Sequence, residues 1–372
     1  MQIQKIKLIN YRNYPDKEIF FESGLNVLLA PNGTGKSNIL EAIYLLSTTK
    51  SFRTNITKNL ILYNKNEAFV NANLLKNNQE LFVSTKLIQH GKKKFLINKN
   101  PVTRINDIFE MINMVCFTPE DIEIVKGAPS ERRKYLDLLL NKLDPKYFEQ
   151  LHKYTRLLKQ KHKLLKDHRT LDKNLLEVIN QQLSEPLYYM GKRRKQLIER
   201  INQKIKDIIL KVTDGKEVVE IKYLPSLEER DAREIENKLN SSFNYEKMYG
   251  HSQYGVHKDD FDLILNNKDA KSFASFGQQR LITLALRIFE IEIIQEKYQQ
   301  MPIILLDDVL LELDNPRKRL ILNVLQKEAQ IILTATDFEK INEIEKNKHI
   351  IQLDSPHPSR DASHLPHLHG EG

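Results

Sequence analysis

The sequence predicts an α/β fold that is interrupted by a long helical insert, and three observations indicate it. Residues 25–46 follow the order buried strand, glycine-rich loop, helix. Residues 128–215 carry apolar side chains at helical spacing, and strand-like apolar runs return after residue 216. We therefore expect an α/β head over residues 1–127 and 216–352, a helical second lobe over 128–215 and a disordered tail over 353–372.

The elements expected before the insert are mostly strands. The first 25 residues predict two short strands around residues 11–14, and residues 25–30 form an aliphatic strand. Residues 38–46 have the apolar spacing of a helix. Residues 68–102 contain three apolar runs separated by polar turns, so we expect an antiparallel meander there.

Two long helices are expected in the insert. Asp144 and Pro145 have the order of an N-cap residue followed by proline at the first helical position. An apolar stripe follows as far as residue 179, and Pro186 is expected to restart a second, antiparallel helix. Residues 128–215 contain 21 Lys/Arg and 11 Asp/Glu, a net charge of +10, which leaves −1 for the remainder.

Strands and one helix are expected after the insert. Residues 215–224 and 261–268 predict strands, and residues 281–296 predict a helix. Residues 301–306 and 331–334 are aliphatic without alternation, which is typical of central parallel strands covered on both faces.

Composition excludes several classes of protein. The chain has 372 residues, enough for two or three domains, and a net charge of +9, which favours an anionic partner such as nucleic acid. Its single cysteine, Cys116, excludes a disulfide framework and fits a reducing compartment. No signal peptide and no apolar run near the roughly 20 residues of a membrane span is present, so we expect a cytoplasmic protein.

The segment APNGTGKS has the composition of a phosphate-binding P-loop, with alanine at the position where glycine is commoner. A glycine-rich turn between a buried strand and a helix directs backbone N–H groups toward phosphates. Lys36 is expected to reach the β/γ-phosphates, and the Ser37 hydroxyl to ligate Mg²⁺. The alternative is an ordinary strand-to-helix turn. The expected ATP-binding residues are Ala30, Pro31, Asn32, Gly33, Thr34, Gly35, Lys36, Ser37 and Asn38.

Two carboxylates end the aliphatic strand MPIILLDD. Open α/β sheets bind ligands at the carboxyl ends of their strands. Asp307 is therefore expected to hold Mg²⁺, and Asp308 to orient or deprotonate the attacking water. Taken alone, the pair is equally consistent with a strand that ends in a polar turn. Together with Lys36 it predicts a catalytic site.

Ser275 precedes the apolar helix LITLALRIFEI, a position typical of an N-cap. The surrounding sequence also resembles the signature loop of ABC-type ATPases, which contacts a nucleotide bound to a second subunit. That resemblance implies signature roles for Ser275, Gly277 and Gln278 and a D-loop that ends at Asp314. It also implies a switch segment over residues 334–336, with Thr336 at the switch position.

Several motifs together resemble the RecF family of bacterial DNA-repair ATPases, within the ABC/SMC-type group. Thr336 and Asp308 stand where transporter ATPases carry histidine and glutamate, and Val256 and Lys258 stand where the family usually has proline and arginine. The resembling stretches are residues 8–14, 31–44, 50–54, 117–137, 255–261, 273–287 and 305–314.

The resemblance implies an ABC/SMC-type P-loop ATPase head with an inserted helical lobe. It also implies ATP and Mg²⁺ as cofactors, a homodimer that forms on ATP binding, and slow, DNA-stimulated hydrolysis. The implied partners are double-stranded or gapped DNA and RecR and RecO-type proteins that help load recombinase.

A basic cluster lies in the insert, and it is the candidate DNA contact. Its members are Lys192, Arg193, Arg194 and Lys195. On a generic long helix such a cluster is more often a solvated face. Resemblance to a DNA-bound ATPase favours phosphate contacts instead.

Three other functions compete with this prediction. The first is an ATP-gated DNA clamp or scaffold of the SMC type with incidental hydrolysis. The second is the nucleotide-binding subunit of a membrane transporter, which the basic insert and Thr336 disfavour. The third is a small-molecule P-loop kinase, which has no use for a signature loop.

Overall fold

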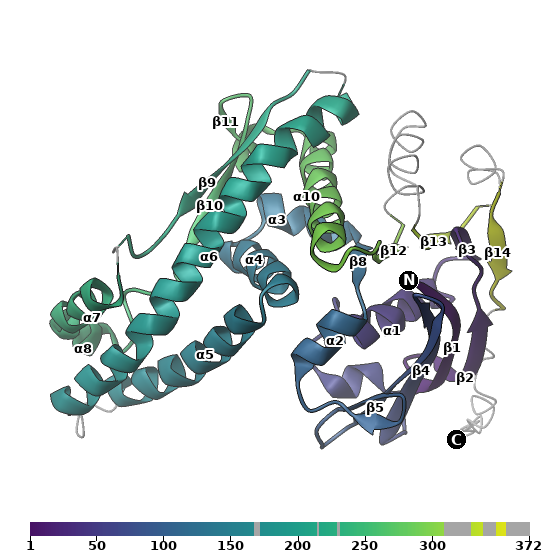
Figure 1. The fold of residues 1–372 in the computed structure, drawn as a ribbon, viewed down its shortest axis with the longest axis horizontal. Helices are drawn as coiled ribbons and strands as arrows, with labels where there is room; N and C mark the ends of the chain where they lie inside the picture. The colour runs from purple at the N-terminus through teal and green to yellow at the C-terminus, as the bar shows by residue number, and fades with distance from the viewer. Residues whose placement is uncertain (167–171, 214–215, 229–230, 309–328, 338–346, 355–372) are drawn as a thin grey trace, which may run out of the picture. The chain divides into compact units, whose positions relative to one another are not determined.

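The computed structural model describes residues 1–166, 172–213, 216–228, 231–308, 329–337 and 347–354. By internal contacts the chain divides into two compact units, residues 1–103 with 303–372 and residues 104–302 (Figure 1). This division differs from the predicted boundaries at 128 and 215, because the segments on both sides of the insert pack with it in the second unit. The predicted tail lies outside the described residues from 355 onward.

The first unit contains a six-stranded antiparallel sheet in the order β2-β1-β4-β5-β6-β7. Ile6, Leu8, Val70 and Val83 are fully buried on its inner face, while alternate residues face outward. The expected two strands and meander are therefore present. The bounds are β1 (Gln2–Tyr11), β2 (Tyr14–Phe20), β4 (Glu67–Lys76), β5 (Gln79–Ile88), β6 (Lys94–Ile97) and β7 (Asn100–Pro101), with a 3₁₀ turn η1 (Thr57–Leu60) before β4.

The first unit also contains four parallel strands in the order β14-β3-β13-β12. The two aliphatic strands β12 and β13 are buried at every residue, as their unbroken apolar composition predicts. Helix α1 (Lys36–Thr48) follows β3 after the loop of residues 30–35. The strands are β3 (Leu25–Leu29), β12 (Ile303–Leu306), β13 (Ile331–Ala335) and β14 (His349–Gln352).

Long helices dominate the second unit (Figure 1). Helices α5 and α6 pack together as an antiparallel pair, but the expected restart at Pro186 is wrong because α6 is continuous through that residue. Leu183, Leu187 and Met190 are buried around the proline, and this packing offsets the missing backbone N–H. The helices are α4 (Pro129–Leu143), α5 (Pro145–Lys166), α6 (Lys173–Thr213) and α10 (Phe276–Tyr298).

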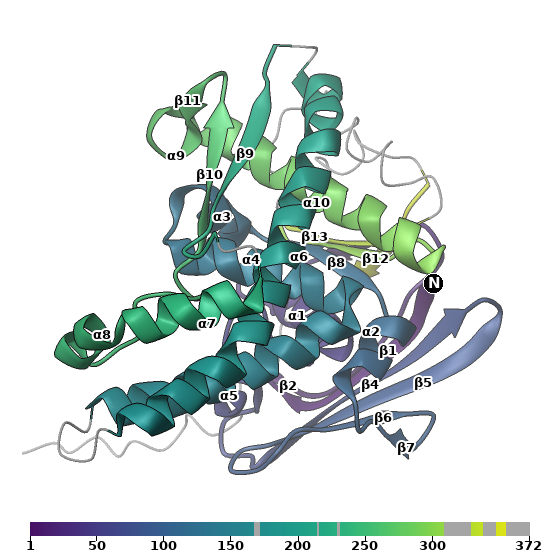
Figure 2. The same ribbon diagram turned by 60° about the vertical axis from the view of Figure 1, so that its left-hand side comes forward.

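Shorter elements complete the second unit, and β11-β10-β9 form a small antiparallel sheet (Figure 2). No helix among the described residues is long and apolar enough to cross a membrane. The remaining elements are α2 (Ile105–Met111), β8 (Met114–Phe117), η2 (Pro119–Ile122), α3 (Glu123–Lys126), β9 (Val219–Leu224), α7 (Ala232–Ser241), α8 (Phe243–Tyr249), β10 (Asp260–Leu265), β11 (Lys268–Asp269) and α9 (Ala270–Phe273).

Candidate nucleotide-binding site

The P-loop connects β3 to α1, as the sequence predicts. Gly33 and Gly35 have φ angles of 81° and 105°, in the left-handed region that favours glycine. A Cβ atom on Gly35 would lie 2.5 Å from the side-chain nitrogen of Asn13 and 2.8 Å from the Tyr14 hydroxyl. Ala30 does not adopt a positive φ, so alanine fits that position without backbone strain.

The turn between β1 and β2 supports the P-loop, a contact that sequence reasoning missed. The Asn13 side-chain amide and the Tyr14 hydroxyl both donate to the backbone oxygen of Thr34, at 3.0 and 3.2 Å. Asn38, at the start of α1, donates to Asn13 at 2.8 Å. The only available signal in the sequence was the family-like stretch that contains this turn.

Lys36 lies folded back on its own loop. Its ammonium donates to the backbone oxygens of Ala30 and Pro31, at 2.7 and 2.9 Å. Burial lowers the pKa of Lys36, and the nearby carboxylates of Asp308 and Asp307 partly oppose this effect. An ammonium has three donors, so one remains for a phosphate oxygen.

The predicted Mg²⁺ ligands lie together although 270 residues separate them. The Ser37 hydroxyl donates to Asp307 Oδ1 at 2.8 Å. Burial raises the pKa of Asp307, while hydrogen bonds from Ser37 and Thr334 lower it and the charge of Asp308 raises it further. A hydroxyl and a carboxylate are oxygen ligands that suit Mg²⁺, so these residues fit the ion.

Thr334 belongs to the segment that the resemblance assigns to the switch, but its contact with the two carboxylates was not predicted. It lies in β13, and its hydroxyl is 3.0 Å from Asp307 Oδ1 and 3.2 Å from Asp308 Oδ1. The Asp308 backbone N–H donates to the same hydroxyl at 2.9 Å, and Asp308 has a φ of 52°. Thr334 therefore positions both carboxylates, whereas the predicted switch residue Thr336 is exposed one residue beyond the strand.

The signature segment begins α10 in the second unit. Ser275 is its N-cap and forms a capping box with Gln278, whose backbone N–H donates to the serine hydroxyl at 3.3 Å. Ser275 and Gly277 are exposed. The capping role therefore leaves both residues accessible to another molecule. The predicted D-loop residue Asp314 lies outside the described residues.

The predicted DNA-binding cluster is divided between exposed and buried side chains. Lys192 and Lys195 are exposed, whereas the Arg193 Nε donates to Asp144 at 2.7 Å. Arg194 is only 1% exposed and pairs with Asp137 and Asp259, at 2.7 and 2.9 Å. The prediction for Arg194 is wrong, because a buried guanidinium that already holds two carboxylates does not reach a DNA phosphate.

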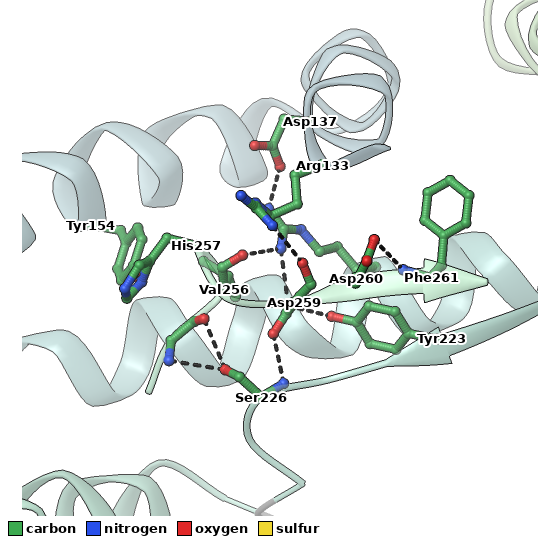
Figure 3. A network of polar contacts seen from close by, with 12 residues as sticks. Arg133, Asp137, Tyr154, Tyr223, Ser226, Val256, His257, Asp259, Asp260 and Phe261 are labelled. Atoms are coloured by element: carbon green, nitrogen blue, oxygen red, sulfur yellow. Dashed lines mark hydrogen bonds and ion pairs between the residues drawn. The ribbon is translucent and has the colours of Figure 1, made fainter. Parts of the chain in front are cut away.

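The segment GVHKDD, residues 255–260, supplies partners for that network (Figure 3). Asp259 also accepts from the Tyr223 hydroxyl at 2.5 Å, and the Val256 backbone oxygen accepts from Arg194 at 2.6 Å. Burial and the neighbouring His162 lower the pKa of His257 to about 4. His257 is therefore neutral near pH 7, and the segment anchors the helices of the second unit.

Comparisons with known proteins agree with the fold. A model described as the RecF/RecN/SMC N terminal domain matches residues 2–357. "DNA replication and repair protein RecF" of Clostridium acetobutylicum is 36% identical to this chain, and the match covers 93% of this chain and 96% of that protein. The protein of the same name from Clostridium perfringens strain 13 is 34% identical, and the match covers 95% of this chain and 98% of that protein.

Solved structures show the same likeness. A structure of the recombination mediator protein RecF with ATP in the RecFOR pathway has a TM-score of 0.85, with 32% identity over 90% of this chain and 92% of that chain. A structure of an SMC head bound to the C-terminal winged-helix domain of ScpA has a TM-score of 0.55 and 16% identity. The match covers 96% of this chain and 95% of that chain, and at this identity it supports the fold alone.

Proposed function

The chain belongs to the RecF family, and we propose that it is an ATP-dependent DNA-binding protein of recombinational gap repair. The observation that carries the proposal is the hydrogen bond of 2.8 Å between Ser37 and Asp307. It joins the P-loop to the carboxylates that end β12, and Thr334 holds those carboxylates in place. Such an arrangement suits a nucleoside triphosphate and a divalent cation.

Residues 30–38 would hold ATP, and Ser37 with Asp307 would hold Mg²⁺. When bound, Mg²⁺ would neutralise charge on the β- and γ-phosphates. Lys36 would transfer its hydrogen bonds from the loop carbonyls to the phosphates. Asp308 would orient the attacking water, and the Thr334 hydroxyl would fix the direction of its carboxylate.

A homodimer would complete the site. Ser275, Gly277 and Gln278 would contact the ATP of a second copy, with Asp314 and Thr336 beside them. The exposure of Ser275 and Gly277 supports this role. Nucleotide binding would then be linked to dimer closure, because the dimer interface would bury the γ-phosphate.

The proposed partners are double-stranded or gapped DNA and RecR and RecO-type proteins that load recombinase. Two structural relatives are described as recombination mediators of the RecFOR pathway, which supports this assignment. We propose that the functional head comprises residues 1–127 and 216–352, since it must include both the P-loop and the signature serine, and that residues 128–215 form the second lobe.

The test of the proposal is the oligomeric state in ATP. Light scattering should find dimers with Mg²⁺-ATP and monomers with ADP or without nucleotide. Ser275→Arg should bind ATP with unchanged affinity yet remain monomeric, because the added side chain blocks the partner's phosphate. Ser241→Arg, at the exposed end of α7, is the matched control and should dimerise normally. Normal dimers of Ser275→Arg would contradict the assignment.

A second candidate is an ATP-gated DNA clamp whose hydrolysis is incidental. The hydrogen bond between the Thr334 hydroxyl and Asp308 Oδ1 favours it, because that carboxylate oxygen already has a partner that an attacking water would have to displace. ATP turnover with and without DNA separates the two candidates: stimulation by DNA supports a working ATPase, whereas equal rates support the clamp.

A further inference from the structure

Positive charge gathers in a part of the first unit that lies outside the helical insert. Residues 50–103 contain ten Lys/Arg and two acidic residues, Glu67 and Glu80. The resulting charge of +8 is nearly the whole net charge of +9. A net charge of −1 for all residues outside the insert conceals this segment, because the other residues outside the insert carry −9.

The densest part of this segment is the run of Lys92, Lys93 and Lys94, which ends the turn after β5 and begins β6. The half-buried Lys93 donates to the backbone oxygen of Thr49, the C-cap of α1, at 3.3 Å. Lys50 follows Thr49. Burial lowers the pKa of Lys93 and the charge of Lys50 lowers it further, while the Glu41 carboxylate partly opposes both effects. We call Lys50, Lys92, Lys93 and Lys94 the basic corner.

The three exposed lysines of the basic corner form no ion pair within the described part of the chain. No acidic side chain there lies within ion-pair distance of Lys50, Lys92 or Lys94, all of which are exposed. The cross-strand neighbour of Lys94 differs, since Lys86 pairs with Glu67 at 2.7 Å. Several like charges without counter-charges make a site for an anion that carries several charges itself.

The basic corner is separate from the ATP phosphates. The P-loop leads into the N-terminal end of α1, whereas Thr49 and Lys50 follow its C-terminal end. The helix has 13 residues, so the two ends lie about 20 Å apart at a rise of about 1.5 Å per residue. An anion at the basic corner is therefore a second ligand.

We infer that the basic corner is a contact surface for the phosphate backbone of duplex DNA. This inference rests on the proposed function. Flexible lysines suit phosphates that are held by charge, without base recognition. No large apolar side chain is exposed in the turn of residues 89–94, which disfavours a protein partner, because protein interfaces bury an apolar centre.

The test compares two matched pairs of exposed lysines. Lys92→Gln/Lys94→Gln removes two charges from the basic corner, and Lys192→Gln/Lys195→Gln removes two from α6. The slope of log affinity against log salt for duplex DNA should fall by about 1.8 in the first variant, because each lost phosphate contact accounts for about 0.9. It should change little in the second variant. ATP affinity should be unchanged in both.

Each outcome decides the inference. A slope that falls in the first variant alone, or in both, supports the basic corner as a DNA contact. An unchanged slope in the first variant, with the wild-type protein binding DNA, overturns the inference and leaves the proposed function intact. If the wild-type protein binds no DNA in any nucleotide state, the DNA-binding part of the proposed function fails together with the inference.

Discussion

The basic corner of the first unit and the basic cluster of α6, residues 192–195, both contain consecutive cations, but they differ in the ion pairs that those cations form. Lys92, in the turn before β6, and Lys94, the first residue of β6, form no ion pair in the described structure. On α6, Arg193 and Arg194 pair with Asp144, Asp137 and Asp259. Charge counted along a chain therefore differs from charge presented to a partner.

The second unit as a whole shows the same difference between the charge of a segment and the net charge of the folded unit. Residues 128–215 carry +10, yet residues 104–302 contain 35 Lys/Arg and 31 Asp/Glu, a net charge of only +4. Acidic residues that follow the insert in sequence neutralise its cations: Lys161 pairs with Glu246, and Arg132 with Asp260. Some of the insert's cations are therefore paired inside the second unit and are not presented to a partner.

The largest expected effect comes from breaking the buried network. Arg194→Met should destabilise the protein by about 3–5 kcal/mol, because Asp259 would remain buried without a counter-charge. Urea unfolding measures this loss. A change below about 1 kcal/mol would show that Arg194 is not essential to the network.

A smaller effect is expected from acid. Burial alone would raise the pKa of Glu290, but the charges of Lys142 and Arg287 outweigh it, so the folded pKa lies below the ordinary value of 4.5. The stability that Glu290 contributes is complete above about pH 4.5 and is lost as pH falls through the folded pKa.

Stability measured across this acid range tests the role of Glu290. Glu290→Gln should flatten the pH dependence, while Lys92→Gln/Lys94→Gln should follow the wild-type profile, because its lysines have no carboxylate partner in the described structure. A profile of Glu290→Gln that matches the wild type would contradict the assignment.

The smallest effect is expected from the exposed lysines of α6. Lys192→Gln/Lys195→Gln should change the free energy of unfolding by less than about 0.5 kcal/mol, because surface charges without buried partners contribute little. The urea midpoint checks this. A larger loss would place these two lysines with Arg194 in the structural part of the helix.

Sequence patterns anticipated the elements of the head well. The P-loop, the aliphatic strands β12 and β13 and the N-cap at Ser275 were predicted at their observed positions, because each depends on a few adjacent residues. The continuous helix through Pro186 was not predicted, since its packing against other helices outweighs the local preference of proline.

The site divides in the same way. From the amino-acid sequence alone, Lys36, Ser37, Asp307 and Asp308 were predicted as residues of a nucleotide site, because phosphate and Mg²⁺ binding favour those residue types within a P-loop and at the end of an aliphatic strand. Tertiary structure decided that Thr334 holds the two carboxylates and that Asn13 supports the P-loop. It also decided which cations are paired. Those contacts join residues far apart in the chain, and no local pattern records a partner that only folding brings near.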